Sequence, residues 1–313
     1  MARIAQLLAR HLALLTLAAA VAAYLHPPLF LPFRHVFLWL FAATMFALGL
    51  VLEPAEARAV AREPRAVALG VLTQFTVMPA AGYAVARLGG FPPELALGFV
   101  IVGAAPGAMA SNVIVYLAGG ATAFSVAMTT VATFLSPLVT PALVERLGGA
   151  FLPVPFWSMV GTILWTVVLP LAAGMALQRP LGRRLPRVRA LAPGVAALAI
   201  VVICAYAVAA NQARIAAAGA AVFGAVVALN AAGYAAGWAL GRLYRFDRRH
   251  RLALAIEIGM QNAGLGVALA LAHFGPATAL PGALFAVWCV LTGAAATAVL
   301  RRRAPAPAVP PAP

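Results

Sequence analysis

Long apolar stretches follow one another through almost the whole sequence, and they limit the possible folds more than any other feature. The 313 residues are 64% hydrophobic and 9% charged, with a mean hydropathy of +0.98, which is typical of polytopic membrane proteins. A helix needs about twenty residues to cross the hydrocarbon core. We therefore expect one integral membrane domain, residues 1–303, with ten spans at 12–25, 36–52, 67–86, 95–117, 121–144, 156–177, 191–210, 217–240, 252–274 and 277–300.

The arginines support this number of spans, because all 22 basic residues are arginine and basic residues concentrate in cytoplasmic loops. When the connections are assigned alternately to the two sides of the membrane, the side opposite the N-terminus holds only Arg34, Arg87, Arg146 and Arg214. A miscounted span in the middle would have mixed the two groups. We therefore predict cytoplasmic termini and a location in a bacterial inner membrane.

The two ends of the sequence need separate interpretation. Arg3 and Arg10, followed by a Leu/Ala run, also fit a cleavable signal peptide, and charge does not choose between this and a retained first span. The symmetry described next favours retention. Residues 304–313 alternate Ala and Pro and are predicted to be a disordered tail, because proline lacks the backbone donor that a helix needs.

The predicted spans form two sets of five that meet at Pro153-Val154-Pro155, and the fourth span of each set carries a polar interruption. An odd number of crossings turns the second set upside down relative to the first. This is the inverted-repeat plan of secondary transporters, with the binding site where two broken helices meet near the midplane. The predicted fold class is thus all-α, with two inverted five-helix repeats and broken, crossing spans 4 and 9.

The two polar interruptions are PGAMASN at 106–112 and EIGMQNAG at 257–264. Their prolines and glycines favour breaks in helical hydrogen bonding, and broken helices expose backbone carbonyls. Kinks that only accommodate helix packing are the simpler alternative. Such kinks do not explain the polar side chains of Ser111, Asn112, Gln261 and Asn262.

Glu257 is the only acidic residue inside a predicted span. A carboxylate at this depth is either a structural hydrogen-bond partner kept neutral or a functional cation ligand or proton carrier, and we favour a functional role. Ser125 and Thr129 lie one turn apart on one face of the fifth span, and Gln74 is a lone amide in the third. Taken singly these residues prove little, since membrane Ser and Thr mostly bond to their own backbone.

The segment ASNVIVYLAGGATAFSVAMTTVATFLSPLVTP, which ends at Pro141, closely resembles the bile acid:sodium symporter family, as does EIGMQNAGLGVALA at 257–270. The resemblance covers nearly the whole chain. It implies a substrate cavity between a core of spans 3–5 and 8–10 and a panel of spans 1, 2, 6 and 7. It also implies two co-transported sodium ions.

Matching the motifs position by position assigns ligands to both sodium sites. The resemblance implies that the first site contains Ser111, Asn112, Ser125, Thr129 and Glu257. It implies that the second contains Gln74, Glu257, Gln261 and the backbone carbonyls of Ile258 and Met260. Asn262 would face the substrate. Met109 would also lie at the substrate, although it departs from the family pattern, which often has a small hydroxyl residue there.

Other functional classes fit the sequence less well. No GxSxG, HExxH or paired carboxylates occur at membrane depth, so we expect no enzyme. A net charge of +15 does not indicate nucleic-acid binding, because the arginines lie in short loops. A channel would need a polar face along several spans. The closest alternative is a proton-coupled carrier that uses Glu257, which would not need the surrounding oxygen donors.

The function predicted from the sequence is therefore sodium-coupled symport of an organic anion, either bile-acid-like or a small carboxylate. Its partners would be that anion and membrane lipid. A monomer is compatible with the sequence, which does not name the substrate.

Overall fold

The computed structural model describes residues 12–52 and 62–303, and the regular elements within these ranges are helices. The first half contains α2 (Leu12–Leu25), the short 3-10 helices η1 (Pro27–Leu29) and η2 (Leu31–His35), α3 (Phe37–Val51), α5 (Pro64–Leu88), α6 (Pro93–Ala104), α7 (Met109–Leu117), α8 (Thr122–Leu143) and the π-helical η3 (Val144–Gly148). The second half contains α9 (Phe156–Ile163), the π-helical η4 (Leu164–Val168), α10 (Leu169–Leu181), the 3-10 helix η5 (Gly182–Arg184), α11 (Leu185–Ala209), α12 (Gln212–Leu243), α13 (Arg248–Gly259), α14 (Ala263–His273) and α15 (Pro276–Arg303).

The helices follow the predicted apolar stretches, and both predicted breaks are present between α6 and α7 and between α13 and α14. Among the described residues, six helices are long and apolar enough to cross a membrane. A seventh candidate is the pair 14–25 and 27–35, which is bent by 115°. The protein is therefore an integral membrane protein. Length and composition do not establish ten crossings, because α3, α6 and α14 are shorter than a full span, and the ten-span plan stays a prediction.

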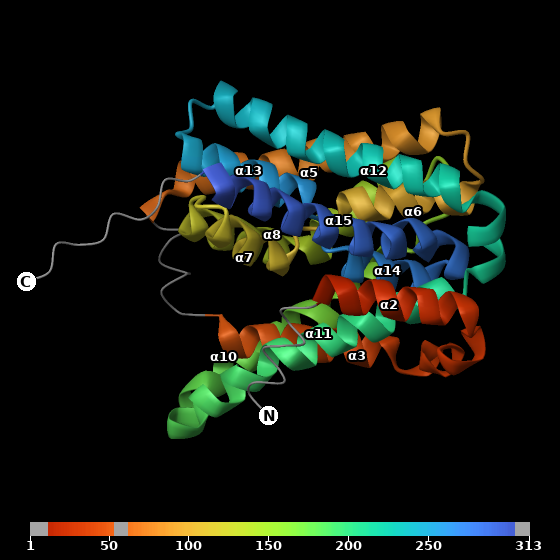
Figure 1. Cartoon of the computed structure of the whole chain (residues 1–313), viewed down its shortest axis with the longest axis horizontal. Helices are drawn as coiled ribbons and strands as arrows, with labels where there is room; N and C mark the ends of the chain where they lie inside the picture. Colours follow the sequence, from red (N-terminus) through yellow and green to blue (C-terminus); the bar gives the residue numbers. More distant parts are fainter. Residues whose placement is uncertain (1–11, 53–61, 304–313) are drawn as a thin grey trace, which may run out of the picture.

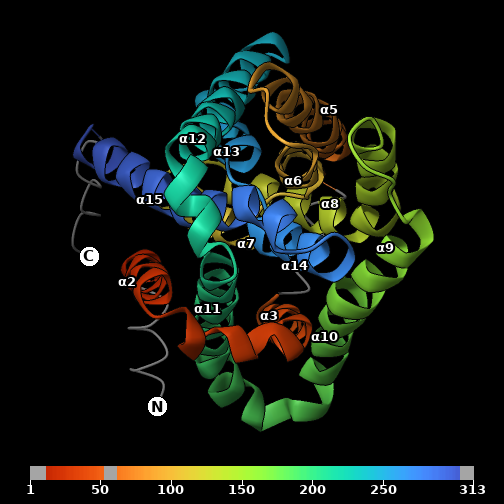
Figure 2. The same cartoon turned by 90° about the vertical axis from the view of Figure 1, so that its right-hand side faces the viewer.

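Apart from α9, which packs against α8 and continues through η4 into α10, the long helices form two groups, which both views of the ribbon separate (Figures 1 and 2). One group, here called the bundle, contains α5 to α8 and α12 to α15. The other, the side layer, contains α2, α3, α10 and α11. The side layer contacts the bundle along α11, which packs against α14 and α15. The predicted tail and residues 1–11 lie outside the described residues.

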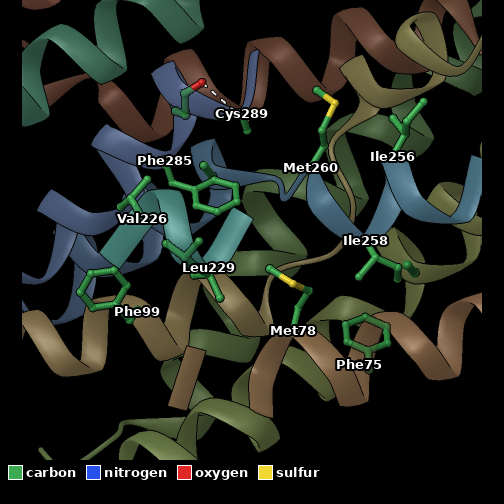
Figure 3. Close-up of a cluster of buried hydrophobic side chains, with 14 of the residues drawn as sticks. Phe75, Met78, Phe99, Val226, Leu229, Ile256, Ile258, Met260, Phe285 and Cys289 are labelled. Carbon is green, nitrogen blue, oxygen red and sulfur yellow. Dashed lines mark hydrogen bonds between the residues drawn. The ribbon is translucent and has the colours of Figure 1, made fainter. Parts of the chain in front are cut away.

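Two large apolar clusters hold these groups together. Figure 3 shows the interior of the bundle, where Phe99 of α6, Leu229 of α12 and Phe285 of α15 are fully buried. A second cluster joins the side layer to the bundle and includes Phe41 of α3 and Ile203 of α11. Many exposed side chains are large and apolar, for example Trp39 at 77%, as expected for helices that face lipid.

A polar contact outside the apolar stretches joins the beginnings of α5 and α13. Asp247 is the N-cap of α13, and its Oδ1 accepts a hydrogen bond from the backbone N–H of His250 at 2.8 Å. The His250 ring lies 3.0 Å from Asp247 Oδ1 and 2.8 Å from Glu63 Oε2. Partial burial lowers the pKa of His250, but the hydrogen bonds to these carboxylates outweigh burial and raise the pKa above its usual value.

Candidate functional site at the crossing of the two broken helices

The two helix breaks lie against each other and exchange backbone hydrogen bonds. Gly107 and Gln261 form an antiparallel bridge. The Ala108 N–H donates to the Met260 carbonyl at 2.9 Å, and the Asn262 N–H donates to the Pro106 carbonyl at 2.8 Å. Helix ends leave backbone groups without partners inside the helix. Each break therefore provides hydrogen-bond partners for backbone groups of the other break, which makes the crossing a single structural unit.

Local sequence explains the geometry of the first break. Pro106 has no backbone donor and disfavours helical conformation in the residue before it, and Ala105 is accordingly extended with a ψ of 152°. Gly107 allows a close approach, because a Cβ atom there would lie 2.7 Å from Glu257 Oε2. These two residues thus bring the chain from α6 against the side chain of Glu257.

Glu257 lies at the centre of a fully buried group of hydroxyls. Ser111 and Ser125 donate hydrogen bonds to Glu257 Oε1, and Thr129 Oγ1 donates to Oε2 at 2.6 Å. Asn112 Oδ1 lies 2.7 Å from Ser125 Oγ and 3.3 Å from Thr129 Oγ1. The five side chains predicted for the first sodium site therefore meet in one place, although they come from α7, α8 and α13.

The group around Glu257 has more acceptor oxygens than protons to share. Ser111 Oγ also lies 2.5 Å from the Ala108 carbonyl, and Thr129 Oγ1 lies 3.0 Å from the Ser125 carbonyl. Each hydroxyl has one proton to donate. Within the described ranges, no arginine or histidine forms an ion pair with Glu257. A buried carboxylate without a positive partner costs free energy, so this arrangement suits an added cation.

The residues predicted for the second sodium site form an adjoining group of amides. Gln74 Nε2 donates to Gln261 Oε1 at 2.6 Å and to the Ala105 carbonyl at 2.9 Å. Gln261 Nε2 donates to the Ile258 carbonyl at 2.7 Å. Gln74 Oε1 has no hydrogen-bond partner although the residue is fully buried. That oxygen is an acceptor available to a cation.

Two contacts concern the other residues predicted for the second site, whose binding of sodium stays a prediction. Among the described residues, the side chains that donate hydrogen bonds to the Glu257 carboxylate are Ser111, Ser125 and Thr129, all of the first group. The Met260 carbonyl accepts from the Ala108 N–H, so the opposite break already holds it.

Asn262 and Met109, the predicted substrate contacts, begin the two helices that leave the crossing. Asn262 is the N-cap of α14, and its Oδ1 accepts from the Leu265 N–H at 3.1 Å. Met109 is the first residue of α7. Both are partly exposed, as Asn112 is, whereas Ser111 and Gln261 are buried. Their contact with substrate stays a prediction.

Sequence reasoning missed two residues that bind the backbone of the breaks. Asn230 Nδ2 donates to the Gly259 carbonyl at 2.8 Å, and Thr140 Oγ1 donates to the Ala104 carbonyl at 2.8 Å. Asn230 was detectable in principle, because it is a lone amide within an apolar stretch, as Gln74 is. Thr140 was not, since nothing distinguishes it from other membrane threonines.

The donor set of the crossing favours a hard cation. The oxygens come from hydroxyls, amides, backbone carbonyls and one carboxylate, which are the ligand types that hard cations prefer. The described part of the chain has no group of three or more His, Cys, Asp or Glu side chains that could hold a metal ion.

Comparison with known proteins finds a family of sodium symporters and several similar transporters. The sodium bile acid symporter family matches residues 38–218. YocS of Bacillus subtilis (strain 168), described as an uncharacterized sodium-dependent transporter, is 37% identical over 274 residues, which cover 88% of this chain and 85% of YocS.

Two plant relatives are similar over a comparable part of the chain. BASS1 of Arabidopsis thaliana is 33% identical over 263 residues, covering 84% of this chain and 66% of the relative. BASS2 of Oryza sativa subsp. japonica is 31% identical over 265 residues, covering 84% of this chain and 63% of the relative. Both are described as probable chloroplastic sodium/metabolite cotransporters. This chain therefore spans slightly less than two thirds of the length of these two relatives.

Proposed function

The chain belongs to the sodium bile acid symporter family, and we propose that it couples the transport of an organic anion to sodium ions. This is a family of transporters and not of enzymes, in agreement with the sequence. The observation that supports the proposal most strongly is the buried Glu257 carboxylate. Three hydroxyls donate hydrogen bonds to it, and no cationic side chain among the described residues forms an ion pair with it.

We assign the first sodium ion to the oxygens around Glu257, contributed by the side chains of Ser111, Asn112, Ser125 and Thr129. An ion there would balance the buried negative charge and relieve the shortage of protons among the acceptors. We assign a second sodium ion to Gln74, Gln261, Glu257 and the carbonyls of Ile258 and Met260. The unpartnered Gln74 Oε1 supports this second assignment.

We further propose that the chain crosses the membrane ten times, as two inverted sets of five spans within residues 1–303. In this plan α6 with α7 forms span 4, and α13 with α14 forms span 9. The bundle would be the core domain, and the side layer together with α9 would be the panel. The separation of the two groups of helices supports this division (Figure 2). Transport would then proceed by alternating access around the crossing.

The substrate would bind beside Asn262 and Met109, where the N-termini of α7 and α14 meet the crossing. Helix N-termini carry partial positive charge, which suits a carboxylate or sulfonate. The names of the plant relatives support a metabolite in general. Because sodium would bind α7 and α13 together, it would order this surface and raise anion affinity, and linkage requires the anion to raise sodium affinity by the same factor.

Uptake by purified protein in liposomes tests the proposal. Bile acids, steroid conjugates and keto acids would be screened with an inward sodium gradient and with choline replacing sodium at constant ionic strength. We expect uptake of at least one anion to require sodium. Uptake that is unchanged by choline but follows an imposed pH gradient would contradict the proposal and support a proton-coupled carrier.

A further inference from the structure

Asn230 lies outside both helix breaks yet binds the backbone of one of them. It belongs to α12, its side chain is 2% exposed, and its Nδ2 donates to the Gly259 carbonyl at 2.8 Å. None of the sodium ligands assigned above includes Asn230. The hydrogen bond connects α12 directly to the end of α13.

The position of Gly259 gives this hydrogen bond its importance. Gly259 stands between Ile258 and Met260, whose carbonyls are assigned to the second sodium ion. The Ile258 carbonyl accepts from the Gln261 side chain at 2.7 Å, and the Met260 carbonyl accepts from the Ala108 N–H at 2.9 Å. Those two donors belong to the crossing itself. Among the three carbonyls, only that of Gly259 is held from outside it.

The chemistry of the peptide bond explains how Asn230 acts on its neighbours. A peptide unit is planar, so fixing the Gly259 carbonyl also fixes the N–H of Met260 on the opposite edge. The N–H edge of this unit is held within α13, because the Met260 N–H donates to the Ile256 carbonyl at 3.0 Å, and its carbonyl edge is held by Asn230. The side chains of Ile258 and Met260 are anchored in the buried cluster of Figure 3. Asn230 adds a constraint on the Gly259 carbonyl from α12, outside both breaks.

Neighbouring side chains hold Asn230 in this orientation. The Thr292 hydroxyl of α15 donates to Asn230 Oδ1 at 3.1 Å, and the Tyr234 hydroxyl lies 3.2 Å from the Thr292 hydroxyl. The Tyr234 ring covers Gly259, since a Cβ atom there would lie 2.5 Å from the ring. The amide therefore presents its Nδ2, not its Oδ1, to the break.

We propose that Asn230 is a positioning residue that sets sodium affinity by orienting the carbonyls of Ile258 and Met260. The proposal deepens the proposed function and rests on it, because it requires that these carbonyls bind sodium. Asn230 does not contact the ion itself.

Sodium binding to purified protein tests the proposal without knowledge of the substrate. The increase in melting temperature would be titrated with NaCl, with choline chloride keeping ionic strength constant. Asn230→Leu removes the donor at similar volume. Losing a neutral hydrogen bond typically costs ~0.5–1.5 kcal/mol, so the half-saturating sodium concentration should rise roughly two- to tenfold.

Asn211→Leu is the matched control. Asn211 is also 2% exposed, and its Nδ2 donates to the Ala207 and Pro276 carbonyls at 2.8 and 2.7 Å, away from the crossing. We expect this variant to lower the melting temperature without changing half-saturation by sodium. A folded Asn230→Leu protein with the half-saturation of the wild type would overturn the proposal, even if its melting temperature fell.

Thr292→Val provides a second test, which can be used even if the Asn230→Leu protein does not fold. It removes the hydroxyl beside Asn230 Oδ1 at constant shape, whereas Thr292→Ser retains that hydroxyl. We expect Val to raise the half-saturating concentration and Ser to leave it unchanged, and equal values for both would overturn the proposal. If the wild-type protein shows no sodium-specific stabilisation, the proposed function fails instead.

Discussion

Replacing Glu257 by glutamine would remove the negative charge at the crossing while nearly preserving the shape of the side chain. Oε1 and Oε2 together accept hydrogen bonds from Ser111, Ser125 and Thr129, and an amide would present one acceptor in place of two. The charge matters more than the lost acceptor. For unit charges about 4 Å apart at an effective dielectric constant of ~20, the attraction is roughly 4 kcal/mol.

This attraction corresponds to about a thousandfold increase in the sodium dissociation constant of the Glu257→Gln protein. The wild-type protein at sodium concentrations near 100 times its dissociation constant would gain about 2.7 kcal/mol of stability. At ~2–4 °C per kcal/mol, its melting temperature should rise by roughly 5–10 °C. Glu257→Gln should show almost none of this rise over the same range.

Thermal unfolding of the purified proteins in NaCl and in choline chloride gives the rise in melting temperature caused by sodium and the melting temperature without sodium. A second prediction concerns the sodium-free proteins. Because the wild-type protein then holds an uncompensated buried charge, Glu257→Gln should melt no lower than wild type in choline. A variant that kept the full sodium-specific rise would refute the assignment and leave the carboxylate with a structural role.

Four further changes test other parts of the account. Ser125→Ala should raise half-saturation by sodium roughly three- to tenfold, because one uncharged oxygen ligand is lost and the charge remains; loss as complete as in Glu257→Gln would contradict this ranking. Gly107→Ala should insert in the membrane but lose sodium-dependent uptake, since the new Cβ would stand 2.7 Å from the carboxylate; normal uptake would refute that packing. His250→Gln should lower the melting temperature more at pH 6 than at pH 9, because a raised pKa gives a stabilisation that is present below the unfolded pKa of about 6.5 and is lost as pH rises through the folded value; an equal effect at both pH values would contradict it. A reporter fused after residue 313 should be active on the cytoplasmic side, and periplasmic activity would overturn the ten-span topology.

The sequence predicted the helices and the polar residues of the crossing because both leave one-dimensional signals. Apolar length marks a membrane helix, and a carboxylate such as Glu257 within it is costly enough to stand out. Pro106 and Gly107 mark the first break through backbone chemistry that does not depend on partners. The structure brings Ser111, Ser125 and Thr129 together around Glu257, while their binding of sodium stays a prediction.

Hydrogen-bond partners that are brought together only by three-dimensional packing could not be predicted from the sequence. The bond from Asn230 to Gly259 joins residues that are far apart in the chain, and no local pattern specifies it. The same holds for Gln178 of α10, whose Nε2 donates to the Gly49 carbonyl at 2.7 Å. The bend between α2 and the 3-10 helices also escaped prediction, because proline pairs mark a turn without fixing its angle.

Equilibrium binding of radioactive sodium to the purified protein measures occupation of the crossing by the ion itself. In our proposal the crossing of the broken helices binds sodium, and the bound ion is coupled to an anion. We predict saturable binding to the wild-type protein that a transported anion strengthens by ~5- to 150-fold, the range typical of coupled sites. Saturable binding should be absent from Glu257→Gln at the same concentrations. Sodium binding that is unsaturable, or equal in the two proteins, would contradict the account.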